Sequence, residues 1–173
     1  LDRKNFYVVV SDGETAQPEY IELSRENYIN EMLATGSLPV LMKNPIKLNN
    51  KRKYDGGITD PLPVKKAYEM GARDITLIRT YEETFIRKTK FENYIAALAT
   101  KSYPNISRAL ISNTETYNSA LEFINNPPND CKIIQICPPK RLKTKRATIN
   151  HDTLKNDYAI GVNEGLKYIK KFT

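Results

Sequence analysis

The sequence has little histidine and little cysteine, two of the residue types that most often bind transition metals. Its 173 residues include one histidine, His151, and two cysteines, Cys131 and Cys137. A structural metal site needs about four ligands, so we expect no metal ion. The two cysteines lie in one strand-like segment, an even number of residues apart, and we expect both as buried thiols on one face. These counts favour a protein without a cofactor.

Long hydrophobic runs are also missing. No window approaches the roughly 18 consecutive apolar residues of a membrane span, so the sequence predicts no transmembrane helix. The N-terminus, LDRKNFYVVV, enters a strand-like run without the charged and then apolar leader of a signal peptide. We therefore expect a cytoplasmic protein. A chain that opens in a strand, without an initiator methionine, also suggests a part of a longer protein.

Positive charge exceeds negative charge. The formal net charge is +7, with 27 % charged and 40 % hydrophobic residues, a balance typical of a folded protein. The densest basic segment, PPKRLKTKRAT (138–148), begins with two prolines and has no aromatic residue. Nucleic-acid surfaces usually place aromatic rings between the cations, so nucleic acid is the least favoured partner. A solvated loop and a surface for anionic lipid both stay open.

Hydrophobic patterning predicts an α/β chain. The β-branched run at 5–11 predicts a buried strand, and 20–23 predicts a second strand that pairs with it as a hairpin. Further strands are expected at 45–48, 74–78 and 131–137, and helices at 24–34, 63–70, 91–99, 102–126 and 152–169. Ser24 is expected to cap the first helix and Asp152 the last. In the first helix, one stripe holds Tyr28, Ile29, Met32 and Leu33.

The segment from residue 53 to residue 78 has the order of a βαβ unit. A strand leads into the sequence DGG (55–57), Pro63 opens a helix, and another strand follows. Because such a crossover joins parallel strands, we expect residues 1–80 to belong to a parallel α/β sheet. Residues 81–173 are then expected to form a mainly helical extension with one added strand.

Asp55 lies at the corner of this unit. Asp-Gly is a common hairpin turn, because glycine accepts a positive φ and aspartate bonds to the backbone, so a plain turn is one interpretation. A functional role is the other, because parallel α/β sheets gather ligands beyond the carboxyl ends of their strands. In that role, Gly56 and Gly57 would let the backbone turn tightly and present the carboxylate of Asp55.

The ordered motifs around this corner resemble the patatin-like phospholipases, a family of serine acyl hydrolases. The motifs are Gly36-Ser37-Leu38-Pro39, a tyrosine before the acid, Asp55-Gly56-Gly57, Asp60-Pro61, Pro63-Val64, and a helix that ends in Met-Gly-Ala before a strand. The likeness covers nearly all of the chain, and residues 81–173 look like the C-terminal extension of a bacterial subgroup. It implies a three-layer α/β/α fold with a parallel sheet. SDGETAQPE (11–19) and TYEETFIRK (80–88) depart from the family's pattern.

By this resemblance, Asp55 is the base of a Ser–Asp dyad that needs no histidine, and Gly56 and Gly57 shape its turn. Gly36, Ser37 and Leu38 would line the path of the acyl chain, or form a plain turn between a helix and a strand. The family's nucleophile lies in Gly-x-Ser-x-Gly, and this sequence contains no such motif. We therefore expect the C-terminal part of a hydrolase of lipid or other carboxylic esters, inactive alone toward a p-nitrophenyl ester.

The expected partners are a lipid or ester substrate, the N-terminal half of the same protein and an anionic membrane surface. Without that half, the strands at 7–10 and 75–78 would have open edges, so another copy of the chain is a candidate partner. The alternative function is a non-catalytic binding or scaffolding domain that keeps the fold. A Gly-x-Ser-x-Gly motif upstream of Leu1 would favour the enzyme, and its absence would favour the binding domain.

Overall fold

The structure is a computed structural model in which two units alternate along the sequence. It describes residues 5–26, 28–39, 42, 45–88, 91–145 and 147–172. Unit 1 comprises Leu1–Lys65 and Arg87–Asn125, and unit 2 comprises Lys66–Ile86 and Asn126–Thr173. The predicted division into residues 1–80 and 81–173 stays a prediction.

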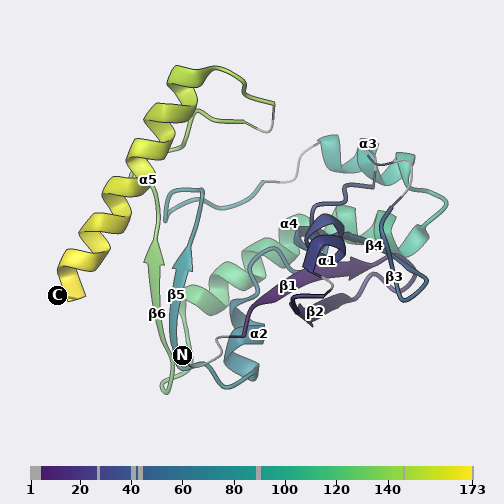
Figure 1. Ribbon diagram of the computed structural model, residues 1–173, viewed down its shortest axis with the longest axis horizontal. Helices are drawn as coiled ribbons and strands as arrows, with labels where there is room; N and C mark the ends of the chain where they lie inside the picture. Colours follow the sequence, from purple (N-terminus) through teal and green to yellow (C-terminus); the bar gives the residue numbers. More distant parts are fainter. Residues whose placement is uncertain are drawn as a thin grey trace. The chain divides into compact units, whose positions relative to one another are not determined.

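Four antiparallel strands form the sheet of unit 1, in the order β2-β1-β4-β3 (Figure 1). The strands are β1 (Tyr7–Asp12), β2 (Pro18–Glu22), β3 (Lys47–Leu48) and β4 (Lys51–Asp55). The predicted hairpin of the first two strands is confirmed, with Val9 opposite Tyr20. The turn between β3 and β4 places Asn49 and Asn50 at φ angles of 52° and 63°, a conformation that asparagine tolerates in two-residue hairpin turns.

Helices complete unit 1. They are α1 (Tyr28–Thr35), the short 3-10 helix η1 (Gly56–Ile58), α3 (Phe91–Ala99) and α4 (Pro104–Asn125). Pro104 begins α4, where its missing N–H breaks no helical hydrogen bond. The core joins β4, η1 and α4 through the buried side chains of Tyr54, Ile58 and Ile106. Burial of these three side chains therefore ties the end of β4 to a helix far along the chain.

The helix α1 is more exposed than its pattern suggests. It begins at Tyr28 rather than directly after Ser24. The hydrophobic stripe predicted for it is largely exposed, with Ile29 at 59 % and Leu33 at 52 %. The helix instead buries Glu31 and Ala34. A helical period predicts the helix, but it does not decide which face meets the sheet.

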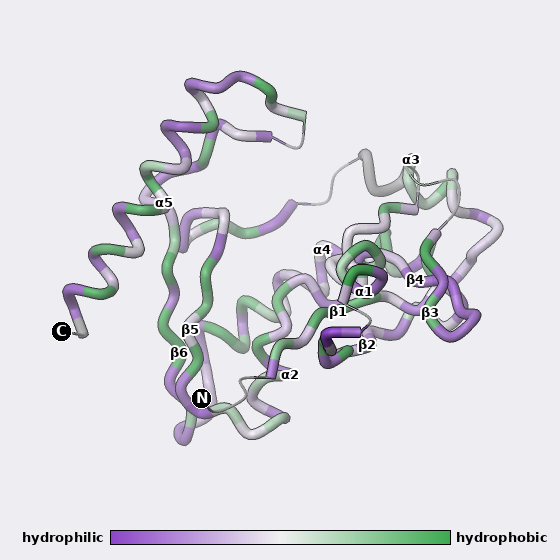
Figure 2. Tube along the Cα trace, in the orientation of Figure 1, coloured by the Kyte–Doolittle hydropathy of each residue, from purple (hydrophilic) through white to green (hydrophobic). Residues whose placement is uncertain are grey.

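Unit 2 contains a parallel pair of strands. β5 (Asp74–Ile78) pairs in parallel with β6 (Lys132–Ile136), and the two form a sheet of their own rather than one sheet with β1 to β4. The helix α5 (His151–Phe172) contacts this pair through the hydroxyls of Thr76 and Tyr168, 2.8 Å apart. Figure 2 shows hydrophobic residues along both strands and an alternation of hydrophobic and hydrophilic residues along α5.

Two helix ends of this part of the chain follow from single residues. Gly71, at a φ of +100°, ends the helix α2 (Val64–Glu69), as predicted. The cap of α5 is Asn150 rather than Asp152, because the side-chain oxygen of Asn150 accepts the N–H of Thr153 at 2.9 Å.

The predicted βαβ unit is wrong. Strand β4 has β1 on one edge and β3 on the other, so neither edge is open to β5, which pairs with β6. The fold is thus mixed α/β, with an antiparallel sheet and a small parallel pair. The described residues do not form the predicted three-layer parallel sheet.

Candidate functional site

Asp55 is the last residue of β4, directly before η1. Its backbone lies at φ −48° and ψ 123°, and its Oδ1 accepts the N–H of Gly57 at 2.8 Å. Asp55 therefore caps the N-terminus of a single 3-10 turn, which satisfies a donor that the turn itself cannot pair. The strand reaches this point opposite Val10 of β1, so the corner lies at the end of an inner strand of the antiparallel sheet.

Gly56 is required by packing rather than by its φ angle. A Cβ at this position would lie 2.2 Å from the backbone oxygen of Val9 and 2.5 Å from its carbonyl carbon. No side chain fits there, because both contacts are to backbone that cannot rotate away. Positive φ angles at the described glycines occur at Gly71 and not at the corner. The close approach of β1 thus explains the glycine at position 56, and the role of Gly56 and Gly57 in presenting a catalytic acid stays a prediction.

Three segments hold the backbone of the corner. The N–H of Asp55 donates to the carbonyl of Ser37 at 2.8 Å, and the hydroxyl of Ser11 donates to the carbonyl of Asp55 at 2.7 Å. Because Ser11 uses its single proton there, Thr59 donates the 2.8 Å hydrogen bond between the two hydroxyls. From α4, the side chain of Asn113 donates to the carbonyls of Gly57 and Ile58 at 2.7 and 2.9 Å. These bonds leave the corner little freedom to move.

The carboxylate of Asp55 is half-buried and only partly engaged. Among the described residues, no hydrogen bond or ion pair is made to its Oδ2. The hydroxyl of Ser11 bonds to the main chain of Asp55, not to its carboxylate. Within the described part of the chain, Asp55 is therefore an acid with one free oxygen and no hydroxyl partner.

The residues predicted to line an acyl path lie directly after α1, which ends at Thr35. Ser37 is fully buried, and its hydroxyl donates to the carbonyl of Leu33 at 3.1 Å. Its own carbonyl accepts the N–H of Asp55, so it joins this helix end to the corner. Gly36 is exposed and Leu38 is half-buried. This is the plain turn that the sequence left open, and a role for Gly36, Ser37 and Leu38 in substrate binding stays a prediction.

A buried ion cluster lies on the same sheet and was not predicted. The ammonium of Lys53, 3 % exposed, lies 2.8 Å from Asp12 Oδ2 and 2.7 Å from Glu19 Oε1. Asp12 is 2 % exposed, and its Oδ1 accepts three further hydrogen bonds. The donors are the backbone N–H of Glu14, the backbone N–H of Thr15 and the hydroxyl of Thr15. The sequence carried one signal, an acid at the end of a β-branched strand, but it could not show which lysine would meet it.

Burial and hydrogen bonding oppose each other in this cluster. Burial alone would raise the pKa of Asp12, but the hydrogen bonds from Lys53, Thr15 and Glu14 hold that pKa far below its ordinary value. Burial would lower the pKa of Lys53, and the carboxylates of Asp12 and Glu19 raise it above its ordinary value. Both groups therefore stay charged at neutral pH.

The remaining titratable groups named from the sequence lie in unit 2. Cys131 is buried and Cys137 half-buried, both as free thiols, and burial raises the pKa of Cys137. His151 is exposed at the first residue of α5. Among the described residues, no group of three or more histidine, cysteine, aspartate or glutamate side chains could hold a metal ion.

Comparisons with known proteins find little that is characterised. A family described as "Domain of unknown function (DUF6363)" matches residues 103–173. "Uncharacterized protein YjjU" of Escherichia coli (strain K12) is 26 % identical over 159 residues. The match covers 91 % of this chain and 44 % of that protein, so the chain spans less than half of its relative's length. No solved structure matches the chain.

These findings correct the family expected from the motifs. Neither matched description names a patatin-like protein, and the predicted membership of that family is wrong. The motif at Gly36–Pro39 follows the end of a helix, and the motif at 55–57 is a capped turn at the end of a strand in an antiparallel sheet. A short sequence pattern alone does not distinguish such a turn from the corner of a parallel α/β unit. Within the described residues, no helix is both long enough and apolar enough to cross a membrane.

Proposed function

We propose that this chain is the acid-bearing part of a carboxylic ester hydrolase in which Asp55 is the general base. The observation that carries the proposal is the carboxylate of Asp55, with one oxygen on the N–H of Gly57 and the other without a partner among the described residues. A catalytic group works best when its backbone is held rigidly, and Ser11, Ser37 and Asn113 hold this one.

The nucleophile in this proposal is a serine hydroxyl outside the chain. Oδ2 of Asp55 would accept the hydroxyl proton as the oxygen attacks the ester carbonyl. The protonated acid would then return that proton to the alcohol that leaves, and an acyl-enzyme would remain. In the second half of the reaction, Asp55 would take a proton from the water that attacks the acyl carbon, and would return it to the serine oxygen as the acyl–oxygen bond breaks. No cofactor takes part.

The proposed setting is the cytoplasm, with the other part of the same protein, or a second copy of the chain, as the partner that completes the site. The basic loop at 138–148, whose Arg146 lies outside the described residues, would meet anionic lipid. Its Lys140, Arg141 and Lys143 are exposed, and the N–H of Thr144 donates to Asp157 Oδ2 at 2.6 Å, which joins the loop to α5. A lipid ester near an anionic surface is therefore the proposed substrate class.

The test is an Asp55→Asn variant of the complete gene product, assayed with p-nitrophenyl butyrate. Asparagine keeps an oxygen for the N–H of Gly57 and caps helices as well as aspartate does, but it cannot accept a proton. We expect the rate to fall by about a hundredfold or more, the typical contribution of a general base, with an unchanged melting temperature. Residues 1–173 alone are expected not to hydrolyse this ester.

Asp74→Asn is the matched control, because Asp74 is an exposed aspartate in unit 2. Its rate should equal that of the natural sequence. An Asp55→Asn variant that keeps full activity, or a complete gene product that hydrolyses no ester, would show that Asp55 is only a cap.

A non-catalytic binding domain is the second candidate function. It is favoured by a pocket in unit 1 that contains a buried carboxylate oxygen without a partner among the described residues. That pocket is independent of Asp55, which is not among the residues that line it.

A further inference from the structure

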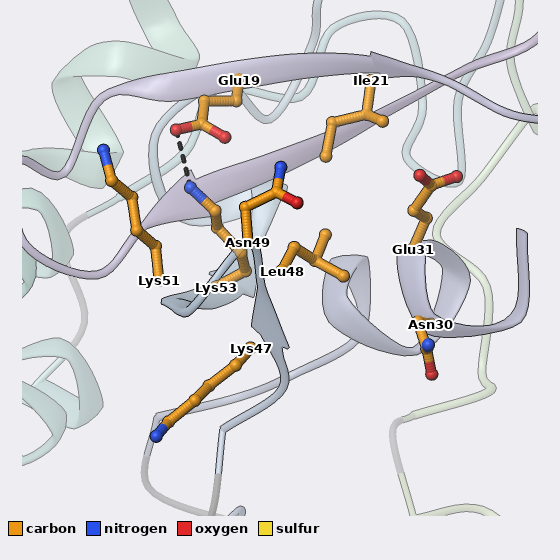
Figure 3. Close-up of a pocket in the computed structure, with 9 residues that line it drawn as sticks. All are labelled: Glu19, Ile21, Asn30, Glu31, Lys47, Leu48, Asn49, Lys51 and Lys53. Carbon is orange, nitrogen blue, oxygen red and sulfur yellow. Dashed lines mark hydrogen bonds and ion pairs between the residues drawn. The ribbon is translucent and has the colours of Figure 1, made fainter. Parts of the chain in front are cut away.

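A pocket of about 510 Å³ opens in unit 1 beside β2, the β3–β4 hairpin and α1 (Figure 3). Its volume lies within the roughly 300–1,000 Å³ of sites that bind small molecules. Four kinds of side chain line it: two carboxylates, two asparagines, three lysines and two aliphatic side chains. Which ligand such a mixture accepts depends on which of its charges already have a partner.

Glu31 is the buried charge without a partner. Its side chain extends from α1, on the pocket side of the helix, and the residue is 7 % exposed. Among the described residues, no hydrogen bond or ion pair is made to its carboxylate, whose Oε2 is fully buried. A buried carboxylate oxygen without a donor costs free energy, and most such atoms in folded proteins have a partner. A ligand with an N–H donor would supply the missing hydrogen bond.

The lysines of the pocket leave the charge of Glu31 unmatched. The ammonium group of Lys53 is already bound by two other carboxylates, at 2.8 and 2.7 Å. Lys47 and Lys51 are exposed, and in Figure 3 their side chains extend away from Glu31. Water and salt screen exposed charges much more than buried ones. The unmatched charge that a ligand meets inside the pocket is therefore the negative charge of Glu31.

The neighbours of Glu31 restrict the class of cation. In the view of Figure 3, the half-buried aliphatic side chains of Ile21 and Leu48 lie between Glu31 and the ammonium group of Lys53, so they offer a surface for an alkyl chain. A bare metal ion is disfavoured, because the described residues contain no group of three side chains that could hold one. We infer that this pocket binds a primary alkylamine in its protonated form. Its ammonium group donates to Oε2 of Glu31, and its alkyl chain lies against Ile21 and Leu48.

The inference does not rest on the proposed hydrolase, and four matched probes test it. The first is n-pentylamine, which carries both the charge and the N–H donors. Pentyltrimethylammonium keeps the charge without an N–H, 1-pentanol keeps the chain without a charge, and pentanoate reverses the charge. Isothermal titration of the full chain should show that pentylamine binds, and that each of the other three binds at least about tenfold more weakly, as expected for the loss of a charge-assisted hydrogen bond.

Two variants assign the ends of the ligand. Glu31→Gln keeps the size of the side chain but removes its charge, and it should weaken pentylamine binding at least about tenfold. Leu48→Ala should weaken pentylamine more than ethylamine, because the shorter chain has less apolar contact to lose. Glu115→Gln, at an exposed position of α4, is the control and should bind pentylamine like the natural sequence.

Stability measurements separate binding from folding. Glutamine at position 31 carries no charge, so it should cost no more to bury than the unpartnered carboxylate, and the melting temperature should not fall. The inference is overturned if pentylamine does not bind at millimolar concentration, if any of the other three probes binds as tightly, or if folded Glu31→Gln binds pentylamine as well as the natural sequence does. If Glu31→Gln unfolds the chain, Leu48→Ala and the four probes still decide.

Discussion

Replacement of Lys53 by methionine should destabilise unit 1 by about 3 kcal/mol. Removing one partner of a buried ion pair usually costs about 3–5 kcal/mol, because the other charge stays buried without compensation. Asp12, at 2 % exposure, would be that charge. The estimate takes the lower end of the range, because Asp12 keeps its hydrogen bonds from Thr15 and Glu14.

The second ion pair of Lys53 adds little to this figure. The Glu19 side chain is 41 % exposed, so water can hydrate it once the ammonium is gone. Exposed ion pairs contribute about 0–1 kcal/mol. The loss is therefore assigned mainly to Asp12, and removing the Asp12 charge should recover part of it. We expect Asp12→Asn/Lys53→Met to be more stable than Lys53→Met alone.

Urea denaturation followed by far-ultraviolet circular dichroism measures the effect, since the chain has no tryptophan. Hydrogen exchange of the β1 and β4 amides assigns the transition to unit 1. Lys51→Met is the matched control, because Lys51 is an exposed lysine on the same strand, and its free energy of unfolding should change by at most about 0.5 kcal/mol. Equal losses in Lys53→Met and Lys51→Met would refute the reasoning, as would a double variant less stable than Lys53→Met.

Two further predictions follow from the structure. Gly56→Ala should destabilise the fold by about 1–3 kcal/mol or more, because its Cβ would overlap the backbone of Val9. Gly161→Ala should stabilise α5 by about 0.5–1 kcal/mol, because among the described residues its Cβ would meet no atom within 4 Å apart from the neighbouring turns of its own helix. Thermal melts that rank the two variants the other way would contradict this. Folding lowers the pKa of Asp12, so ionised Asp12 stabilises the folded state. This contribution to the free energy of unfolding is fully present above the pKa of an unfolded aspartate, near 3.9, and is lost as the pH falls toward the lower pKa of the folded state. Urea midpoints should therefore fall between about pH 5 and pH 2, and less steeply in Asp12→Asn; equal slopes would rule out this role for Asp12.

The local pattern of the chain predicted many of its elements. The strand at 74–78 and the helix at 91–99 have the predicted bounds. These elements depend on residues close together in sequence: β-branched runs, helical spacing and turn formers. The same is true of Gly71, whose positive φ ends α2.

The pairing of strands could not be predicted in this way. A strand, a short helix and a second strand suggested a parallel crossover, but β1 and β3 occupy both edges of β4. Which strands pair depends on contacts between distant residues, such as Val10 with Asp55, and these leave no mark on the local pattern. The same limit explains the exposed stripe of α1 and the corrected family assignment.

By itself, the sequence determined the identity and position of most helices and strands and singled out Asp55 with its two glycines. Only the tertiary structure decided what surrounds them: that Val9 excludes a side chain at Gly56, that Lys53 meets Asp12, and that Glu31 lies buried beside a pocket. The physical reason is the separation along the sequence over which each interaction acts. Backbone preference acts over a few residues, whereas burial, ion pairing and steric exclusion depend on whichever distant segment the fold brings into contact.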